Sequence, residues 1–192
     1  MARPKSEDKR NAILEAAVSQ FALRGAWSTP TSAVSKEAGV AEGTLFTYFA
    51  SKDELVNVLY RTLKQELADA MLIGYPRKAD IRTRLRHVWT TFVQWGVSNP
   101  ARYKVMMQLR VSDQLSDESK AFGLAAFCEL QQLALDAIQA KVVKNYPVEY
   151  INALFGSLAE TTMSFVATSQ DPQHDYSADG FEILWRGLSS EG

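Results

Sequence analysis

The stretch TSAVSKEAGVAEGTLFTYF, Thr31–Phe49, decides the fold of this chain. Two short helical patterns flank the turn at residues 39–41, and each carries one apolar pair at i and i+4, which gives it a single buried face. The pairs are Val34 with Ala38 and Leu45 with Phe49. Gly39 stands where a helix ends in a left-handed residue, a conformation that glycine adopts without a Cβ clash. The pattern predicts a helix-turn-helix, whose second helix is built to enter a DNA major groove.

A further helix is expected before this stretch, from about Ser6 to Gly25. Glu7 and Asp8 fall in its first turn, where the helix dipole favours carboxylates. Its apolar residues recur at helical spacing and must face a partner: they are Ile13, Leu14, Ala17, Val18 and Phe21. Thr31 is a suitable N-cap for the helix that follows.

A long helix is expected directly after the motif, over about Lys52–Leu72. Ser51 and Glu54 have the spacing of a capping box, and apolar residues follow at once. This helix is the only continuous element that joins the N-terminal unit to the rest of the chain. Residues 74–76, Gly-Tyr-Pro, end it.

The remaining sequence also has helical periodicity and no sustained strand-like alternation. The expected helices end at Gly96, open at Pro100, run over about 117–145, restart at Pro147 as far as about Ser169, and close with about 177–188. The fold class is therefore all-α, with an N-terminal three-helix bundle joined by the long helix to a helical C-terminal domain. We expect residues 1–50 to form the helix-turn-helix domain and residues 51–192 the linking helix and second domain.

Composition limits the function classes. The 192 residues carry a net charge of −1 and are 46% hydrophobic, and the lone Cys128 excludes an intrachain disulfide. Residues 1–60 hold seven basic and seven acidic residues, so DNA binding would rest on placed contacts rather than on a broad positive field. No apolar run approaches the ~18 residues of a membrane span, and no early run resembles a signal peptide. We expect a cytoplasmic protein with no membrane partner.

Residues 10–60, and above all AGVAEGTLFTYFASKDEL at 38–55, resemble the DNA-binding domain of the TetR family of bacterial transcriptional regulators. The resemblance implies a homodimer that binds a palindromic operator in double-stranded DNA and usually represses transcription. It also implies a small-molecule effector that enters the C-terminal domain and releases the DNA.

The same resemblance supplies candidate DNA contacts: Thr31, Ser32, Ser35, Glu42, Gly43, Thr44, Thr47, Tyr48 and Lys52. Thr31, Tyr48 and Lys52 are expected at phosphates, and Thr44 at a phosphate or a thymine methyl. Glu42 is able to accept from a cytosine amino group, although a carboxylate at a helix start also serves the dipole. Arg3 and Lys5 are candidates for a flexible arm that reaches a groove.

Two residues depart from the family pattern. Ala41 stands where a serine usually caps the recognition helix, and loss of a cap costs about 1 kcal/mol. Phe46 stands where tyrosine is typical, so no hydroxyl is available there. We expect Thr44, Tyr48 and Lys52 to carry more of the anchoring.

An apolar ligand pocket is expected from aromatic and methionine residues of the C-terminal part. The candidates are Trp89, Phe92, Trp95, Tyr103, Met106, Met107, Phe127, Phe155 and Met163. They favour a hydrophobic or aromatic ligand, and ordinary core packing is the alternative. His87 is expected at the surface beside Arg82, Arg84 and Arg86.

Residues 147–188 are apolar enough to bury a face against a second chain as a four-helix homodimer interface, with burial inside one chain as the alternative. Catalysis, cofactors and metals have no support: Cys128 is expected to be a buried, inert thiol, and His87 and His174 belong to no recognisable cluster. Two rival functions are a helical binding protein that keeps the motif as a scaffold, and an enzyme in the C-terminal bundle.

Overall fold

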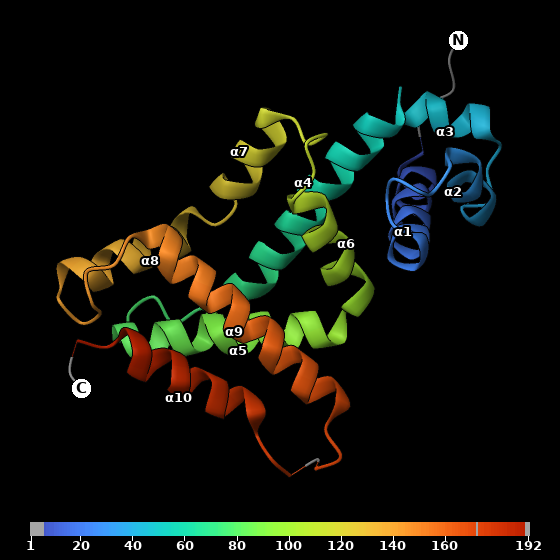
Figure 1. The fold of residues 1–192 in the computed structure, drawn as a ribbon. Helices are drawn as coiled ribbons and strands as arrows, with labels where there is room; N and C mark the ends of the chain where they lie inside the picture. The colour runs from blue at the N-terminus through green and yellow to red at the C-terminus, as the bar shows by residue number, and fades with distance from the viewer. Residues whose placement is uncertain (1–5, 172, 191–192) are drawn as a thin grey trace. The chain divides into compact units, whose positions relative to one another are not determined.

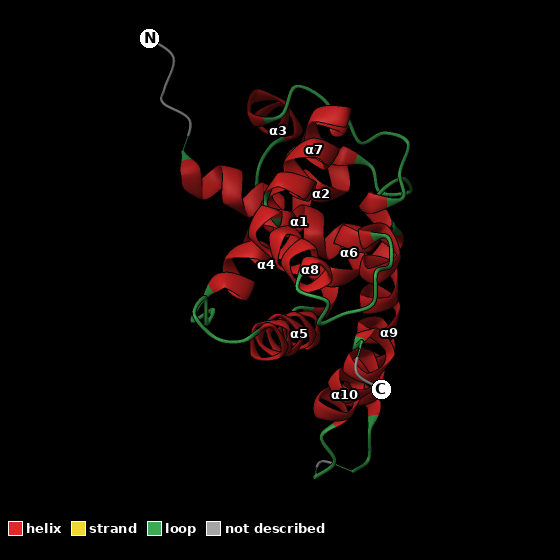
Figure 2. Ribbon diagram, turned by 90° about the vertical axis from the view of Figure 1, so that its left-hand side faces the viewer, coloured by secondary structure: helices red, strands yellow, loops and turns green. Residues whose placement is uncertain are grey.

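The structure is a computed structural model that describes residues 6–171 and 173–190. Within these ranges the chain forms ten helices joined by loops, with one isolated bridge between Val143 and Ser189 and no strand (Figures 1 and 2). The helices are α1 Glu7–Arg24, α2 Thr31–Glu37, α3 Glu42–Tyr48, α4 Lys52–Leu72, α5 Ile81–Ser98, α6 Pro100–Arg110, α7 Asp117–Ala125, α8 Cys128–Gln139, α9 Val148–Thr168 and α10 Tyr176–Leu188. The all-α prediction is confirmed.

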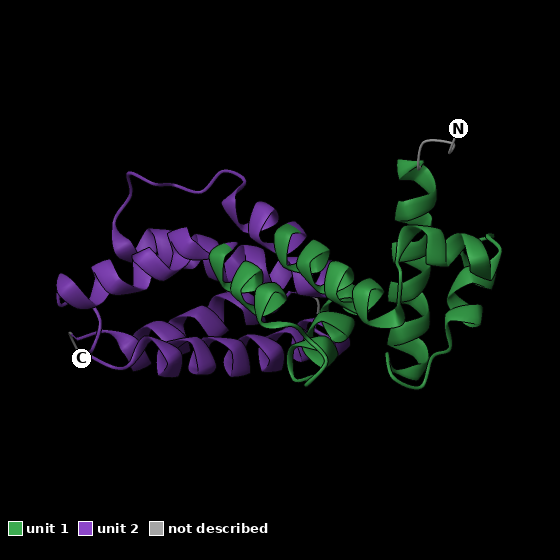
Figure 3. Cartoon of the chain, turned by 90° about the horizontal axis from the view of Figure 1, so that it is seen from above, with its two compact units in different colours: residues 1–65, 100–125 green, residues 66–99, 126–192 purple. Residues whose placement is uncertain are grey.

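The chain divides into two compact units (Figure 3). Unit 1 comprises residues 1–65 and 100–125, and unit 2 comprises residues 66–99 and 126–192. α6 and α7 therefore group with the N-terminal helices, and α4 contributes to both units. The boundary at residue 50 remains a prediction about where an independent domain ends.

The core of the helix-turn-helix lies between α1, α2 and α3. Ile13, Phe21 and Leu45 are fully buried, and Val34 and Phe49 are almost so, because the apolar stripes read from the sequence face one another. α6 packs along α1, and Arg102 forms an ion pair with Glu15 across the two helices. α1 thus packs on the core side of the motif, and the opposite face of α3 stays exposed to solvent.

The turn between α2 and α3 is a Schellman motif. Gly39 has φ +66°, the Val40 amide donates to the Ser35 carbonyl at 3.0 Å, and the Gly39 amide donates to the Lys36 carbonyl at 3.2 Å. The role predicted for Gly39 is confirmed. The N-cap of α2, however, is Pro30, and Thr31 is the first helical residue, so its assignment as the cap is wrong.

The predicted span Lys52–Leu72 of α4 is confirmed, as is its capping signal. The Glu54 amide donates to Ser51 Oγ at 3.1 Å, and the Glu54 carboxylate accepts from the Ala50 amide at 2.5 Å. The pairing differs by one residue from a regular capping box, in which the carboxylate would return to residue 51. Ser51 thus fixes where α4 begins.

The single helix expected over 117–145 is wrong, because the chain breaks it into α7 and α8. Phe127 at the break has φ −109° and ψ +18°, outside the helical region. The two helices pack on different partners. In unit 1, Gly123 of α7 lies against α4 so closely that a Cβ there would be 2.9 Å from Tyr60 Cε1, whereas α8 packs on α5 in unit 2.

Unit 2 is built from α5, α8, α9 and α10, and α9 lies beside both α5 and α10 (Figure 1). Gly96, expected to end α5, instead lies inside it, where a Cβ would be 2.4 Å from Met163 Sδ. Trp89 is fully buried and donates from Nε1 to the Ser177 carbonyl at 2.8 Å. Gly96 therefore allows α5 and α9 to pack closely. The prediction that it ends the helix is wrong, because a glycine at a close contact has the same sequence signature as a helix stop.

None of the described helices is, by itself, long and apolar enough to cross a membrane. The bent pair α7 and α8 meets the criteria of length and composition only when the two helices are taken together.

Candidate nucleic-acid interface

α3 presents an outward face that the unit does not use for packing. Leu45 and Phe49 point into the core, which leaves Glu42, Gly43 and Thr47 exposed. A Cβ at Gly43 would meet no atom within 4 Å, so the backbone is open to close approach there. The Thr47 hydroxyl donates to the Gly43 carbonyl at 3.0 Å, within the helix itself. This face combines a carboxylate, bare backbone and a hydroxyl with its methyl group.

The flanks of that face are half-buried. Thr44 lies on one flank, together with Tyr48, whose hydroxyl accepts from the Ser6 amide at 2.9 Å. This bond ties the end of α3 to the start of α1. Phe46, with 42% of its surface exposed, borders the opposite flank. The absence of a side-chain cap at Ala41 is confirmed, since Ala41 is the N-cap residue and makes no side-chain bond.

The start of α2 lies against the start of α3. The Thr31 hydroxyl donates to Glu42 Oε1 at 2.7 Å, so two predicted DNA contacts are partners of each other. Ser32, next to Thr31, is exposed.

Ser35 does not belong to this surface. Only 3% of the residue is exposed, and its hydroxyl donates to the Ser32 carbonyl at 3.2 Å. The prediction of a DNA contact is wrong here because position 35 lies on the same face of α2 as Val34, toward the core. A seven-residue helix has too few periods for the sequence to fix that face.

Lys52 begins α4, and its Nζ donates to the Trp27 carbonyl at 3.1 Å. Partial burial lowers the pKa of this ammonium from its ordinary value, and the nearby Asp53 opposes that shift. Trp27 is a residue that sequence reasoning missed. It lies in the loop between α1 and α2, where no periodicity marks it.

A second carboxylate stands near the motif at Glu37. Hydrogen bonds from the Ser19 and Gln20 side chains hold its pKa below the ordinary value, so it stays charged at neutral pH. The motif therefore carries negative charge at the end of α2 and at the start of α3. The predicted arm residues Arg3 and Lys5 lie outside the described residues.

Residues 13–59, which contain this helix-turn-helix, match the family described as bacterial regulatory proteins of the tetR family. This stretch of the chain is therefore similar to the DNA-binding domain of the TetR family. The chain is 39% identical over 62 residues to YhgD of Bacillus subtilis, an uncharacterised HTH-type transcriptional regulator. The aligned stretch covers 32% of each protein. It is 40% identical over 53 residues to the HTH-type transcriptional repressor KstR2 of Mycobacterium tuberculosis, over 28% of this chain and 26% of the relative. The matches thus span about a third or less of these relatives.

The fold of the whole chain is similar to that of a TetR family transcription regulator from Marinobacter aquaeolei. The two superpose with a TM-score of 0.86 over 95% of this chain and 96% of the other, at 22% identity. Outside residues 13–59, the likeness is therefore one of fold.

The predicted ligand residues fall in both units. Trp89, Phe92, Trp95, Phe127, Phe155 and Met163 belong to unit 2, whereas Tyr103, Met106 and Met107 belong to α6 in unit 1. In unit 2, the Phe155 ring packs edge-on against Trp89 and Phe92, with centroids 5.4 Å and 5.3 Å apart. Trp89 and Met163 are core residues by burial, while Phe92, Trp95 and Phe155 are half-buried.

Two expectations about reactive side chains are wrong. Cys128 is exposed at the first position of α8, because α8 begins there and does not run through it. His87 is half-buried, with Nε2 at 3.1 Å from the Met71 carbonyl and its ring beside Tyr75. In the described part of the chain, no group of three or more His, Cys, Asp or Glu residues is placed to hold a metal.

The arginines beside His87 are paired. Arg82 and Arg86 both form ion pairs with Glu182 of α10, and the Arg84 Nε donates to the Tyr75 hydroxyl at 3.0 Å. They join α5 to its neighbours in unit 2 and are not the simple solvated face that the sequence suggested.

Proposed function

We propose that this chain is a sequence-specific DNA-binding transcriptional regulator that acts as a repressor and leaves its operator when an effector binds. The observation that carries the proposal is the exposed face of α3. Glu42, Gly43 and Thr47 are exposed there, while Leu45 and Phe49 bury the opposite face in the core. That is the arrangement in which a recognition helix reads base edges in the major groove. The repressor role is supported by the similarity of a 53-residue stretch to KstR2, an HTH-type transcriptional repressor.

The residues of the motif divide into two groups. Thr47 and Glu42 contact base edges, and Gly43 lets the helix backbone come close to those bases. Thr44, Tyr48 and Lys52 flank the face and are offered to phosphates. An ammonium has three donors, and the bond to the Trp27 carbonyl uses one, so Lys52 is able to bind a phosphate while it stays in place.

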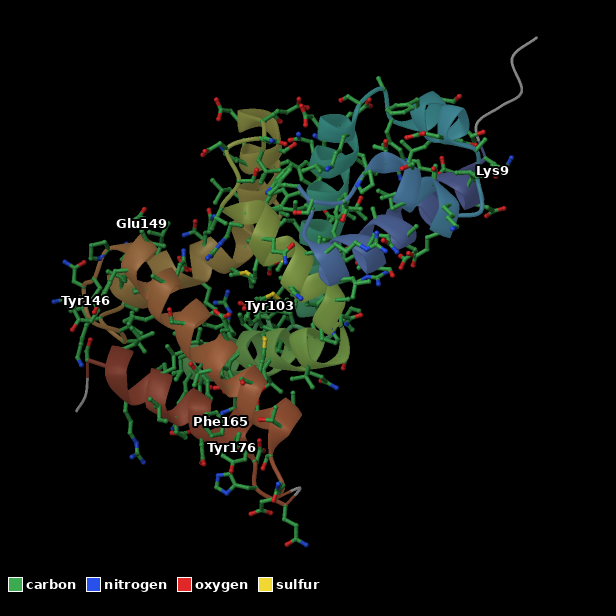
Figure 4. All side chains as sticks on the ribbon, turned by 45° about the vertical axis from the view of Figure 1, so that its right-hand side comes forward. Lys9, Tyr103, Tyr146, Glu149, Phe165 and Tyr176 are labelled. Atoms are coloured by element: carbon green, nitrogen blue, oxygen red, sulfur yellow. The ribbon has the colours of Figure 1, made fainter. Side chains whose placement is uncertain are left out.

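The proposed homodimer uses residues 147–188. Apolar side chains of α9 and α10 remain exposed in the single chain, among them Phe165 at 54% and Ile183 at 61%. Phe165 lies beside Tyr176 of α10, with ring centroids 5.6 Å apart (Figure 4). A second copy that covers this face would bury them, and a palindromic site would then be read by two recognition helices.

The proposed effector is a small, largely hydrophobic molecule bound in the C-terminal domain. Support comes from the half-buried rings of Phe92, Trp95 and Phe155 in unit 2, which are apolar surfaces not fully enclosed by the chain. Binding sites in helical bundles are commonly lined in this way.

The proposal is tested by selection from a library of random DNA duplexes with the full-length protein. We expect enrichment of a palindromic sequence, with an affinity that falls steeply as salt rises because phosphate contacts release counterions. Thr47→Ala should change the enriched sequence, whereas the control Thr90→Ala, at an exposed position of α5, should leave it unchanged. Equal binding to the enriched duplex and to a scrambled one would contradict the proposal.

A further inference from the structure

Thr31 and Glu42 form a contact that joins the two helices of the motif at their starts. Thr31 is the first residue of α2 and Glu42 the first of α3, eleven residues later and beyond the turn at Gly39. The hydroxyl donates to Glu42 Oε1 at 2.7 Å, the usual distance for a hydrogen bond between two oxygens. The contact therefore pairs a neutral donor with the charge nearest the outward face of α3.

This contact changes what Thr31 is able to do. A threonine hydroxyl has one proton to donate, and here that proton goes to the carboxylate. While the bond stands, the hydroxyl cannot donate to a phosphate, which is the role that the family resemblance suggests. A phosphate brought to the same oxygen would also meet the negative charge of Glu42.

The contact also changes Glu42. The N-cap of α3 is Ala41, whose side chain makes no hydrogen bond to the helix start. The bond from Thr31 holds Oε1 on the α2 side. Among the described residues no hydrogen bond reaches Oε2, which stays available to a donor on the exposed side of α3. A carboxylate fixed in this way accepts from an exocyclic amino group without first losing side-chain freedom.

We propose that Thr31 is a positioning residue that orients the Glu42 carboxylate toward the amino group of a cytosine in the major groove. This inference rests on the proposed function, because it concerns which base the motif prefers. Cytosine is the base that a carboxylate reads there, through its N4 amino group. Thr31 thus contributes to specificity through another residue and not through the DNA backbone.

A purely structural role for the bond is distinguishable. If the bond only stabilised the motif, its loss would lower the thermal midpoint and weaken binding to every duplex alike. If Thr31 were a phosphate contact, its loss would likewise weaken binding to every duplex. Only a positioning role makes the base preference depend on the hydroxyl.

The experiment compares full-length wild type with Thr31→Val, which removes the hydroxyl at nearly constant shape, and Thr31→Ser, which keeps it. A duplex enriched by the wild type is varied one base at a time, and each variant is measured by fluorescence anisotropy at one salt concentration. In the wild type, we expect one position of each half-site to favour cytosine by about fivefold or more. Thr31→Val should reduce that preference below about twofold and change affinity for duplexes without this cytosine by less than about twofold, whereas Thr31→Ser should retain it.

Glu42→Gln provides the second arm. It should reduce the same preference, and Thr31→Val in the Glu42→Gln background should change it no further. A preference unchanged in Thr31→Val, or an equal loss on all duplexes, would overturn the inference and leave the regulator proposal standing. A wild type that enriches no sequence would instead overturn the regulator proposal, and this inference with it.

Discussion

The Arg61 guanidinium of α4 donates a 2.7 Å hydrogen bond to the hydroxyl of Ser119 in α7, and Ser119 is fully buried. The Ser116 hydroxyl, which caps α7 by accepting from the Ser119 amide, also donates to Ser119 Oγ at 3.1 Å. On the other side, the Ser116 amide donates to the Asn57 side chain at 2.9 Å. α7 is thus attached to α4 through polar contacts within unit 1.

Ser119→Ala tests this attachment. The change removes the buried hydroxyl that accepts from the half-buried Arg61 guanidinium, so we expect the free energy of unfolding to fall by about 1–3 kcal/mol. Thermal unfolding followed by circular dichroism measures the effect. Lys120→Ala, an exposed change on the same helix, is the control and should shift stability by less than about 0.5 kcal/mol. Equal midpoints for Ser119→Ala and the control would show that the attachment contributes nothing.

The glycines of unit 2 provide a second stability test. A Cβ at Gly180 would lie 2.5 Å from Thr162 Oγ1 and 2.6 Å from Trp89 Cζ2, and a buried tryptophan cannot yield. We expect Gly180→Ala to destabilise by about 1–3 kcal/mol through overpacking. Gly96→Ala meets only the flexible end of Met163, and the helix gain of alanine offsets part of the strain, so its loss should be smaller. The reverse order in chemical denaturation would contradict this account.

Gly43→Ala separates stability from binding. The added methyl meets no protein atom, and alanine stabilises a helix by about 0.5–1 kcal/mol relative to glycine, so the unfolding midpoint should rise slightly. The same methyl projects from the exposed face of α3, so affinity for the enriched duplex should fall. Calorimetry and anisotropy on one protein preparation check both. Unchanged affinity would remove Gly43 from the interface.

Lys52→Ala should weaken binding to every duplex by a similar factor and reduce the slope of log K against log salt by about 1, because a phosphate contact carries no base information. Binding isotherms at several salt concentrations measure the slope. Lys78→Ala, an exposed lysine in unit 2, is the matched control. A change in base preference would assign Lys52 a different role.

Lys64 predicts a pH dependence of stability. Burial, and then the charge of Arg110, lowers its pKa to about 8. Between this value and the higher pKa of the unfolded chain, the folded state binds fewer protons than the unfolded state. The free energy of unfolding therefore rises with pH in that window. Below pH 8 both states are protonated, and the cost of burying the charge is present in full.

Lys64→Met removes that titration. The free energy of unfolding of the variant minus that of wild type should be largest at pH 7 and should decline as pH rises to 9.5. Tyr60 does not ionise within this interval. Burial raises the pKa of the Tyr60 hydroxyl, which keeps this group neutral over the interval. Urea titrations at three pH values measure the difference. A difference that stays constant with pH would contradict the lowered pKa.

Much of the helix-turn-helix was predictable because its signals are local. Gly39 takes the left-handed conformation that the turn requires, Ser51 caps α4, and Leu45 and Phe49 are buried as their spacing indicates. Each of these features depends on backbone sterics or on hydrogen bonds between residues a few positions apart. The family resemblance rests on the same stretch, and the match over residues 13–59 bears it out.

The helix bounds were predicted wrongly where they depend on packing against residues distant in the sequence. Gly96 resembles a helix stop until Met163 is placed against it, and the periodicity over 117–145 continues through the point at which α7 and α8 take different partners. Cys128 was expected in the middle of a helix and is exposed for the same reason. Periodicity within one segment does not record which segment it will meet.

The sequence by itself determined that the chain is helical, that a helix-turn-helix stands at residues 31–49 and where its turn and following helix begin, since these follow from local conformational preferences. Only the tertiary structure decided what the polar residues of the motif do. Ser35 is buried because α2 packs with that face inward, and Thr31 meets Glu42 because the turn brings two helix starts together. Side chains eleven residues apart share a hydrogen bond only after the chain between them has folded.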